Sequence, residues 1–311
     1  MKILVTGGAG FIGSHLCDGL LADGHQVHIV DNLSTGQEEF IARTAVFHRA
    51  DIGDPELAGL FQRERFDVMY HLAAQIDVRA SVADPVADAR TNVLGSLNLL
   101  QQCVASGVGR VVFASTGGAI YGDTEHRPTP EDADCRPVSP YGITKLSLEK
   151  YLHFYRVQHG LAHTVLRFGN VYGPRQNPHG EAGVVAIFCK RLLAGEPAVI
   201  NGDGLQSRDY VHVSDVARAC RLALAVDREE LTCNVGTGVE RDVVALFRIL
   251  RDELAPDTPE RFGPAAPGEQ RTSCLDIRHT RAVLGWQPEV SFEDGLRATA
   301  RWFRERQGGR G

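Results

Sequence analysis

The chain has 311 residues, 43% of them hydrophobic, which is enough to bury a large core in one big domain or two ordinary ones. Its formal net charge of −6 at pH 7 shows no basic excess of the kind that nucleic-acid binding requires, so we expect no nucleic-acid partner. Apolar runs stay well short of the ~20 residues that span a bilayer, and the run at the N-terminus is too short for a signal peptide. We therefore expect a soluble, cytoplasmic protein with no membrane partner.

Seven cysteines are scattered through the chain, with no close pair at metal-ligand spacing. An odd number of dispersed cysteines is typical of buried, reduced thiols in a reducing compartment. The cysteines therefore predict no metal site, and they agree with a cytoplasmic location.

Short apolar strands alternate with helical patterns from residue 2 to about residue 167. The expected strands are residues 2–7, 26–31, 45–51, 67–74, 110–116 and 163–168. The expected helices are residues 11–23, 54–65, 86–106 and 140–159. Such alternation is typical of a parallel sheet covered on both faces. The sequence therefore predicts a doubly wound α/β domain of the Rossmann type in residues 1–167.

The regular alternation ends after residue 168. Gly and Pro cluster in GNVYGPRQNPHG (169–180) and in FGPAAPGEQ (262–270). Long loops in a compact domain are usually functional. We expect a smaller mixed α/β region, formed by residues 168–204 and 229–311, that closes over the carboxyl ends of the strands. Residues 205–228 are expected to return to the first domain.

The segment TGGAGFIG follows the first strand directly and opens a helix. Its glycines can be read as Gly8-x-Gly10-x-x-Gly13 or as Gly7-x-x-Gly10-x-x-Gly13. Either pattern permits a tight turn that puts a pyrophosphate at the positive end of the helix. Asp31 ends the next strand, 18 residues after Gly13, where a carboxylate binds both ribose hydroxyls and repels a 2′-phosphate. The motif therefore predicts NAD rather than NADP.

Tyr141 and Lys145 are four residues apart on the expected helix after the fifth strand, so they share one face. A phenol with a pKa near ~10 is a poor base at neutral pH, but an ammonium within ~4–6 Å favours the phenolate. We expect Lys145 to lower the pKa of Tyr141 and make it a proton acceptor. The alternative is a half-exposed tyrosine beside a solvated lysine. The position of the pair, downstream of the dinucleotide motif, favours the catalytic interpretation.

Six segments, TGGAGFIGSH, DNLSTG, HLAAQ, STGGAIYG, YGITK and RDYVHVSDVA, occur in this order along nearly the whole chain. Together they resemble the extended short-chain dehydrogenase/reductase family, and within it the NAD-dependent nucleotide-sugar 4-epimerases. The resemblance implies a catalytic hydroxyl on the strand before the tyrosine. Many relatives carry a serine where this chain has Gly117, so the hydroxyl is expected from Thr116, with Ser115 as the second candidate.

The resemblance also implies which residues contact NAD and substrate. The implied NAD contacts are Gly7, Gly10, Phe11, Ile12, Gly13, Asp31, Asn32, Ser34, Thr35, Gly36, Asp51, Ile52, Leu72, Ala73, Ala74, Gln75, Asn92, Tyr141, Lys145 and Phe168. The implied substrate contacts are Gln75, Thr116, Gly117, Tyr141, Asn170, Arg175, His179, Val184, Val185, Arg208, Glu269 and Arg271.

Three of these residues carry specific expectations. A guanidinium suits bidentate phosphate contact, so Arg208 is the candidate for the diphosphate. Glu269 is the candidate for the ribose hydroxyls. Arg271 is the candidate for a charge that relatives place where this chain has Ala266. The resemblance further implies a homodimer that associates through the helices at 86–106 and 140–159.

The implied activity is 4-epimerisation of a UDP-hexose, interconverting UDP-glucose and UDP-galactose. Hydride passes from C4 to bound NAD, a 4-keto intermediate turns within the site, and hydride returns to its opposite face. One alternative is a UDP-glucuronate 4-epimerase, with Arg175, His179 or Arg191 receiving the carboxylate. Another is a noncatalytic NAD-binding sensor or scaffold, for which a broken tyrosine–lysine pair would be expected. A 4,6-dehydratase is disfavoured because residues 117–119 lack its acid pair.

Overall fold

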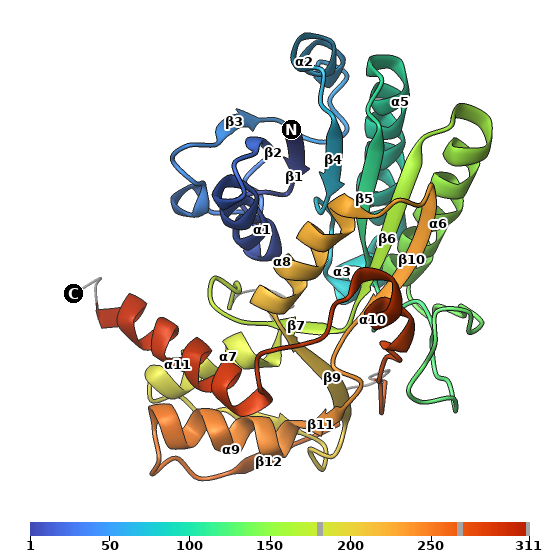
Figure 1. The fold of residues 1–311 in the computed structure, drawn as a ribbon. Coiled ribbons are helices and arrows are strands. Elements are labelled where there is room, and N and C mark those ends of the chain that lie inside the picture. The colour runs from blue at the N-terminus through green and yellow to red at the C-terminus, as the bar shows by residue number, and fades with distance from the viewer. Residues whose placement is uncertain (179–182, 266–269, 309–311) are drawn as a thin grey trace.

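A parallel sheet forms the core of the molecule (Figure 1). The computed structural model describes residues 1–178, 183–265 and 270–308. Within these residues the sheet has seven strands, all parallel, in the order β10-β6-β5-β4-β1-β2-β3. The strands are β1 (Lys2–Thr6), β2 (Gln26–Asp31), β3 (Val46–Arg49), β4 (Val68–His71), β5 (Arg110–Thr116), β6 (Ala162–Phe168) and β10 (Glu230–Val235).

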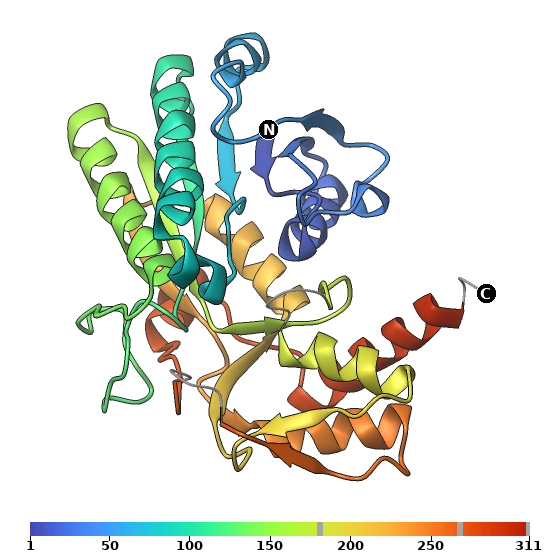
Figure 2. The ribbon, with the colours of Figure 1, turned by 180° about the vertical axis from the view of Figure 1, so that it is seen from behind.

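Helices cover both faces of this sheet (Figures 1 and 2). Helices α1 and α8 pack together on one face, where Leu16 and Val216 join the core. Helices α2, α5 and α6 cover the other face, where Phe61, Leu99 and Leu152 join a second core. The elements around the sheet are α1 (Phe11–Ala22), η1 (Glu38–Phe40), α2 (Leu57–Glu64), α3 (Val78–Ala83), α4 (Pro85–Ala89), η2 (Arg90–Gly95), α5 (Ser96–Ser106), α6 (Pro140–His159), α8 (Val213–Leu222), η3 (Ala223–Ala225) and α10 (Arg278–Leu284). The doubly wound α/β fold predicted from the sequence is confirmed.

Helix α6 carries the tyrosine–lysine pair, and its start is determined by local sequence. The Ser139 hydroxyl accepts a hydrogen bond from the Gly142 N–H at 3.2 Å, which caps the helix. Pro140 occupies the first turn, where its missing N–H has no intrahelical partner to lose. This cap places Tyr141 in the first turn of the helix.

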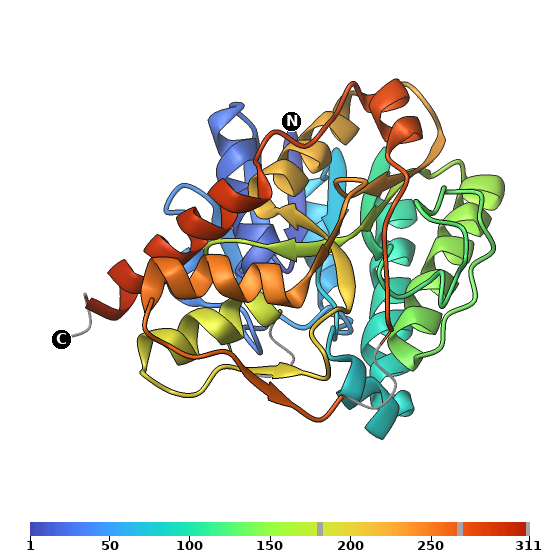
Figure 3. The ribbon, with the colours of Figure 1, turned by 90° about the horizontal axis from the view of Figure 1, so that it is seen from below.

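A second region holds a smaller mixed α/β arrangement beside the carboxyl ends of the main strands (Figure 1). Its sheets have the orders β11-β9-β7 and β12-β8. Helices α7, α9 and α11 lie side by side (Figure 3), around a core that includes Phe188, Phe247 and Leu296. The elements are β7 (Asn170–Tyr172), α7 (Val184–Leu193), β8 (Val199–Asn201), β9 (Ser207–His212), β11 (Glu240–Asp242), α9 (Val243–Leu254), β12 (Arg261–Gly263) and α11 (Phe292–Gly308).

The boundary between the two regions differs from the expected one. Strand β10 lies in the stretch 229–311, expected in the second region, yet it pairs with β6 at the edge of the main sheet. Its alternating residues Leu231, Cys233 and Val235 are buried in the same core as α1 and α8, and this burial explains the pairing. Within the stretch 205–228, α8 lies on the main sheet, whereas β9 pairs with β7 and β11 in the small sheet.

The helices differ from expectation at one place. Residues 86–106, expected as one helix, form α4, the π-helical segment η2 and α5, and the short helix α3 precedes them. A π-helical segment inside a helix is rare and frequently marks a functional site. Among the described residues, no helix is long and apolar enough to cross a membrane.

Candidate functional site

The strand order reverses at β1, which makes the crevice between β1 and β4 a topological switch point. Strands β2 and β3 continue on one side of β1, and β4 and β5 on the other. Ligands of open α/β sheets bind at such a point, outside the carboxyl ends of the strands. Gly7 follows β1 with a φ of +73°, and a Cβ added there would lie 2.7 Å from the Ala73 nitrogen. A glycine is therefore required where these two strand ends meet.

The N-terminus of α1 has the features of an anion site. Its cap is Gly10, which has no side chain to satisfy the first-turn N–H groups, and the first turn carries no acidic residue. Gly13 lies so close to the preceding turn that an added Cβ would be 2.1 Å from the Gly7 oxygen. Backbone N–H groups and the helix dipole are therefore available to a pyrophosphate.

Asp31 is held at the end of β2 with its carboxylate beside the glycine turn. Its Oδ2 accepts a hydrogen bond from the Ala9 N–H at 3.0 Å, and its Oδ1 accepts one from the Leu33 N–H at 2.8 Å. Next to it, the Asn32 amide donates to Asp51 at 2.8 Å and joins the ends of β2 and β3. The glycine turn, the open helix end and this carboxylate together fit the predicted NAD.

The remaining predicted NAD contacts lie around the same crevice. Leu72 and Ala73 follow β4 and donate their N–H groups to Thr6. Phe168 ends β6 opposite Thr116. The others lie at the ends of the strands, in the β2–β3 loop or on the first turn of α1, and they are Phe11, Ile12, Ser34, Thr35, Gly36, Ile52 and Ala74.

Gln75 and Asn92 use their side chains within the protein. The Asn92 Oδ1 accepts from the Gln75 N–H at 2.8 Å, and its amide donates to the Gln75 carbonyl at 2.9 Å. The Gln75 amide in turn donates to the Asp88 carboxylate at 2.8 Å. These two residues therefore position the loop after β4, rather than extending free polar groups from it.

Thr116, Tyr141 and Lys145 come together at the end of β5. The Thr116 hydroxyl is hydrogen-bonded to the Tyr141 hydroxyl. Lys145 is buried, and its Nζ donates to the Ala114 carbonyl at 2.9 Å. The same Nζ lies 5.9 Å from the centroid of the Tyr141 ring. One helix and one strand end therefore supply a hydroxyl, a phenol and an ammonium to one site.

Ser115 belongs to a different cluster, because successive residues of a strand point to opposite faces. Its hydroxyl donates to Glu149 at 2.5 Å, and Glu149 forms an ion pair with Arg167 at 2.6 Å. All three side chains are buried. This geometry contradicts Ser115 as the catalytic hydroxyl and leaves Thr116 as the candidate.

Gly117, the position where many relatives carry a serine, packs against the Leu275 side chain, which would have to shift to admit a side chain there. An added Cβ would lie 2.6 Å from the Leu275 side chain. The neighbouring Gly118 lies near both the Asn170 amide oxygen and the Thr116 hydroxyl, at 3.5 and 3.9 Å from its own added Cβ. Asn170 is thus brought close to the catalytic cluster, as its predicted substrate contact requires.

The pKa of Tyr141 is raised, whereas the sequence predicted a lowered value. Burial raises the pKa of Tyr141, and the charge of Asp88 raises it further, while the hydrogen bond with Thr116 lowers it. Burial lowers the pKa of Lys145 to about 8, against the opposing charges of Asp88 and Glu149. Desolvation of both groups outweighs the attraction that helical spacing suggested.

Asp88 is the site residue that sequence reasoning missed. Its side chain is 1% exposed, and it accepts hydrogen bonds from Gln75, from Asn92 at 3.1 Å and from the Thr144 hydroxyl at 3.0 Å. Thr144 lies on α6 directly before Lys145. An aspartate on an amphipathic helix is usually exposed, so no local signal distinguished this one.

Arg175, a predicted substrate contact, makes its contacts within the protein. Its guanidinium pairs with Asp18 on α1 at 2.8 Å and lies over the Phe40 ring. Arg191, an alternative partner for a substrate carboxylate, donates to the Pro197 carbonyl at 3.2 Å.

The predicted phosphate region is brought together through the backbone. Arg208 donates to the Ser207 carbonyl at 2.8 Å, and the Ser207 N–H donates to the Arg271 carbonyl at 3.0 Å. The exposed Arg271 side chain is paired with Asp203 at 2.7 Å. The positive charge of Arg271 is therefore already paired, and is not free to replace the charge that relatives place at position 266. Val184 and Val185 open α7. The remaining predicted positions, His179, Ala266 and Glu269, lie outside the described residues.

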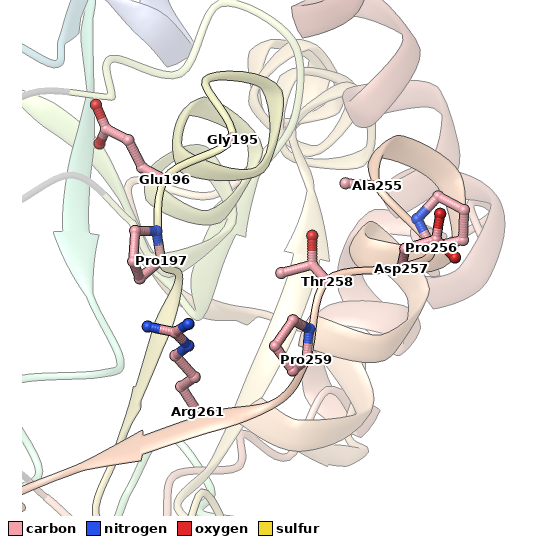
Figure 4. A pocket seen from close by; sticks show the side chains of 9 residues that line it. All are labelled: Gly195, Glu196, Pro197, Ala255, Pro256, Asp257, Thr258, Pro259 and Arg261. Carbon is pink, nitrogen blue, oxygen red and sulfur yellow. The ribbon is translucent and has the colours of Figure 1, made fainter.

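A separate surface hollow of about 340 Å³ lies in the second region, between the end of α7 and the segment joining α9 to β12 (Figure 4). It contains none of the predicted site residues. It is lined by Gly195, Glu196, Pro197, Ala255, Pro256, Asp257, Thr258, Pro259 and Arg261.

The sequence pattern that defines the NAD-dependent epimerase/dehydratase family matches residues 3–236. The chain belongs to this family. The family resemblance seen in the sequence is thereby confirmed. The matched range includes the glycine turn, Asp31, Thr116 and the Tyr141–Lys145 pair.

Family members named UDP-glucose 4-epimerase are similar over nearly the whole chain. The Mycolicibacterium smegmatis enzyme is 46% identical over 312 residues, covering 98% of this chain and 99% of that protein. The Thermotoga maritima enzyme, crystallised with UDP-glucose, has a TM-score of 0.95 and 47% identity, covering 99% of this chain and 100% of that one. The Thermus thermophilus enzyme, in complex with NAD, has a TM-score of 0.92 and 44% identity, covering 98% and 99%.

Proposed function

We propose that the protein is an NAD-dependent 4-epimerase that interconverts UDP-glucose and UDP-galactose. The observation that carries this proposal is the Thr116–Tyr141 hydrogen bond beside Lys145, at the switch point of the sheet. Full-length similarity to three proteins named UDP-glucose 4-epimerase supports the substrate class. A sensor or scaffold would not need this intact cluster.

Cofactor binding is assigned to the glycine turn, the N-terminus of α1 and Asp31. Bound there, NAD supplies the hydride acceptor and donor that epimerisation at C4 needs. The carboxylate of Asp31, held by two backbone N–H groups, would repel the 2′-phosphate of NADP. The residues of this chain therefore favour NAD.

Proton transfer is assigned to Tyr141. As the phenolate, its oxygen takes the proton from the sugar C4 hydroxyl in one half of the cycle, and as the phenol it returns that proton in the other. The Thr116 hydrogen bond orients this oxygen and lowers its pKa. Lys145, with a pKa of about 8, is mostly protonated at neutral pH and supplies positive charge beside the phenol. Because the same group removes and returns the proton, the cycle needs no outside acid.

Substrate binding is assigned to Asn170 near Thr116 and to Arg208 on β9. A guanidinium at Arg208 suits the diphosphate, whose firm binding would let the sugar turn between the two half-reactions. Arg175 and Arg191, two candidate partners for a C6 carboxylate, make contacts within the protein, to Asp18 and to the Pro197 carbonyl. This favours a neutral hexose over UDP-glucuronate.

The test is to incubate the purified protein separately with UDP-glucose, UDP-galactose and UDP-glucuronate, and to follow the C4 epimer by NMR. We expect the two neutral hexoses to interconvert. Conversion of UDP-glucuronate alone would contradict the proposed substrate, and no conversion of any substrate with added NAD would contradict the UDP-sugar assignment.

We also propose that two copies of the chain associate through α5 and α6. Ile143, Tyr151 and Phe154 lie at helical spacing on α6 and are 51%, 39% and 48% exposed, with Val104 of α5 36% exposed. Packing against a second copy would bury this apolar surface. Light scattering after gel filtration should give a dimer mass for the wild type and a monomer mass for Phe154→Asp.

The seven cysteines are all free thiols, which supports the cytoplasmic location we propose.

A further inference from the structure

Phe40, in the short helical turn η1, is enclosed by groups from distant segments. It is 8% exposed, although it lies in the loop between two strands. The guanidinium carbons of Arg175 and Arg306 lie 5.6 and 5.0 Å from its ring centroid. The Trp302 ring is 6.4 Å away. Arg175 follows β7, whereas Trp302 and Arg306 lie on α11, so two parts of the second region meet at one aromatic side chain.

The loop that carries Phe40 is attached to the candidate NAD site at its other end. The Gln37 N–H donates to the Ala9 carbonyl of the glycine turn at 2.9 Å. A Cβ added at Gly36 would lie 2.9 Å from the Asp31 Oδ1. Residues 32–40 therefore form the wall beside the carboxylate that is assigned to the adenosine ribose.

Polar contacts reinforce the attachment on both sides. Arg306 donates to the Gln37 Oε1 at 3.0 Å and forms an ion pair with Glu39. The segment that follows β7 contacts α1, because Arg175 pairs with Asp18. The His15 Nε2 is also within 2.9 Å of the Pro174 carbonyl oxygen. The second region thus holds both the loop and the helix that flank the NAD pyrophosphate and adenosine positions.

We propose that Phe40, with Arg175 and Arg306 over its ring, is a positioning residue that fastens the loop 32–40 to the second region and slows the release of NAD. The proposal rests on the proposed function, in which NAD is regenerated in each cycle and rapid release is of no use. Cation–π contacts with two arginines and the burial of Phe40 provide the fastening. The contacts lie beside the adenosine half, away from Tyr141, so they act on cofactor retention and not on proton transfer.

The experiment measures the exchange of bound NAD for isotope-labelled NAD in the full-length holoprotein, by gel filtration and mass spectrometry. The variants are Phe40→Leu and Arg306→Gln, and the control is Arg301→Gln, an exposed arginine on the same helix. We expect exchange to be roughly tenfold faster in both variants and unchanged in the control. Turnover at saturating NAD should stay within about twofold of wild type, with a higher apparent KM for NAD.

Equal exchange rates in the variants, the control and the wild type would overturn the proposal. So would a fall in turnover at saturating NAD without faster exchange. If Phe40→Leu loses its thermal unfolding transition, Arg306→Gln still decides, because that side chain lies on the last turns of α11. The two proposals can fail separately. If NAD exchange changes as expected but the protein epimerises none of the UDP-sugars, the result would support the role of Phe40 and contradict the proposed function. A wild type that binds no NAD would overturn both.

Discussion

The two ends of the candidate site are built in different ways. The cofactor end is made mostly of backbone: a glycine turn, the open N-terminus of α1 and one carboxylate held by two N–H groups. The catalytic end is made of side chains that meet from β5, α4, η2 and α6. Backbone sites depend on residues that are neighbours in the sequence. Side-chain clusters depend on where the fold brings distant residues.

This difference predicts that substitutions at the two ends fail differently. At the cofactor end, a change of shape should remove NAD together with activity. At the catalytic end, a change of chemistry should remove activity and leave NAD bound. Substitutions at Tyr141, Gly13, Thr116 and Asp88 test this separation.

Replacing Tyr141 with Phe removes the proton acceptor and keeps the ring. We expect turnover to fall roughly 10²- to 10⁴-fold, the range that general acid–base catalysis contributes. The NAD content of the purified protein should match that of the wild type. Loss of NAD along with turnover would contradict the separation of the two ends.

Replacing Gly13 with Ala inserts a methyl group where the Gly7 oxygen lies 2.1 Å away. The turn must move, and overpacking of this kind costs about 1–3 kcal/mol. We expect NAD affinity to fall roughly 5- to 150-fold, measured by titration calorimetry, with turnover partly recovered by added NAD. The control is Ala22→Gly, on the same helix as Gly13. Gly24→Ala would be a poor control because, although nothing lies near the added Cβ, the φ of Gly24 is positive.

Thr116→Val and Ser115→Ala compare the two faces of one strand end. Thr116→Val removes the hydrogen bond to Tyr141, which should lower turnover by roughly tenfold to a hundredfold, as expected for a bond worth about 1.5–3 kcal/mol in a charged state. Ser115→Ala removes a bond to Glu149 and should lower the free energy of unfolding by about 1–3 kcal/mol with a smaller effect on turnover. The reverse pattern would restore Ser115 as the catalytic hydroxyl.

Asp88→Asn removes a buried charge and keeps the shape of the side chain. Asp88 raises the pKa of both Tyr141 and Lys145, and Glu149 also raises that of Lys145. Without the charge of Asp88, both pKa values should fall, so the acidic and alkaline limbs of the pH–rate profile should move to lower pH. An unchanged profile would mean that Asp88 acts on the structure alone.

Much of the fold was predictable because its signals are local. Alternating strands and helices predicted the doubly wound sheet, and the glycine turn predicted its cofactor end. The edge position of β10 could not be predicted, because the sequence of a six-residue strand does not show which strand it pairs with. The division of residues 86–106 into α4, η2 and α5 could not be predicted either, since a π-helical segment has the same apolar pattern as a regular helix.

Local sequence was enough to predict the sheet, the glycine turn, Asp31 and the shared face of Tyr141 and Lys145, because each depends on residues close in the chain or on helical period. The choice between Thr116 and Ser115, the burial of Asp88 beside the catalytic pair and the contacts of Arg175 with Asp18 and Phe40 depend on tertiary contacts. The tertiary structure also reversed the expected pKa shift of Tyr141. The physical reason is that desolvation and charge depend on which distant groups surround a side chain, and local sequence does not carry that information.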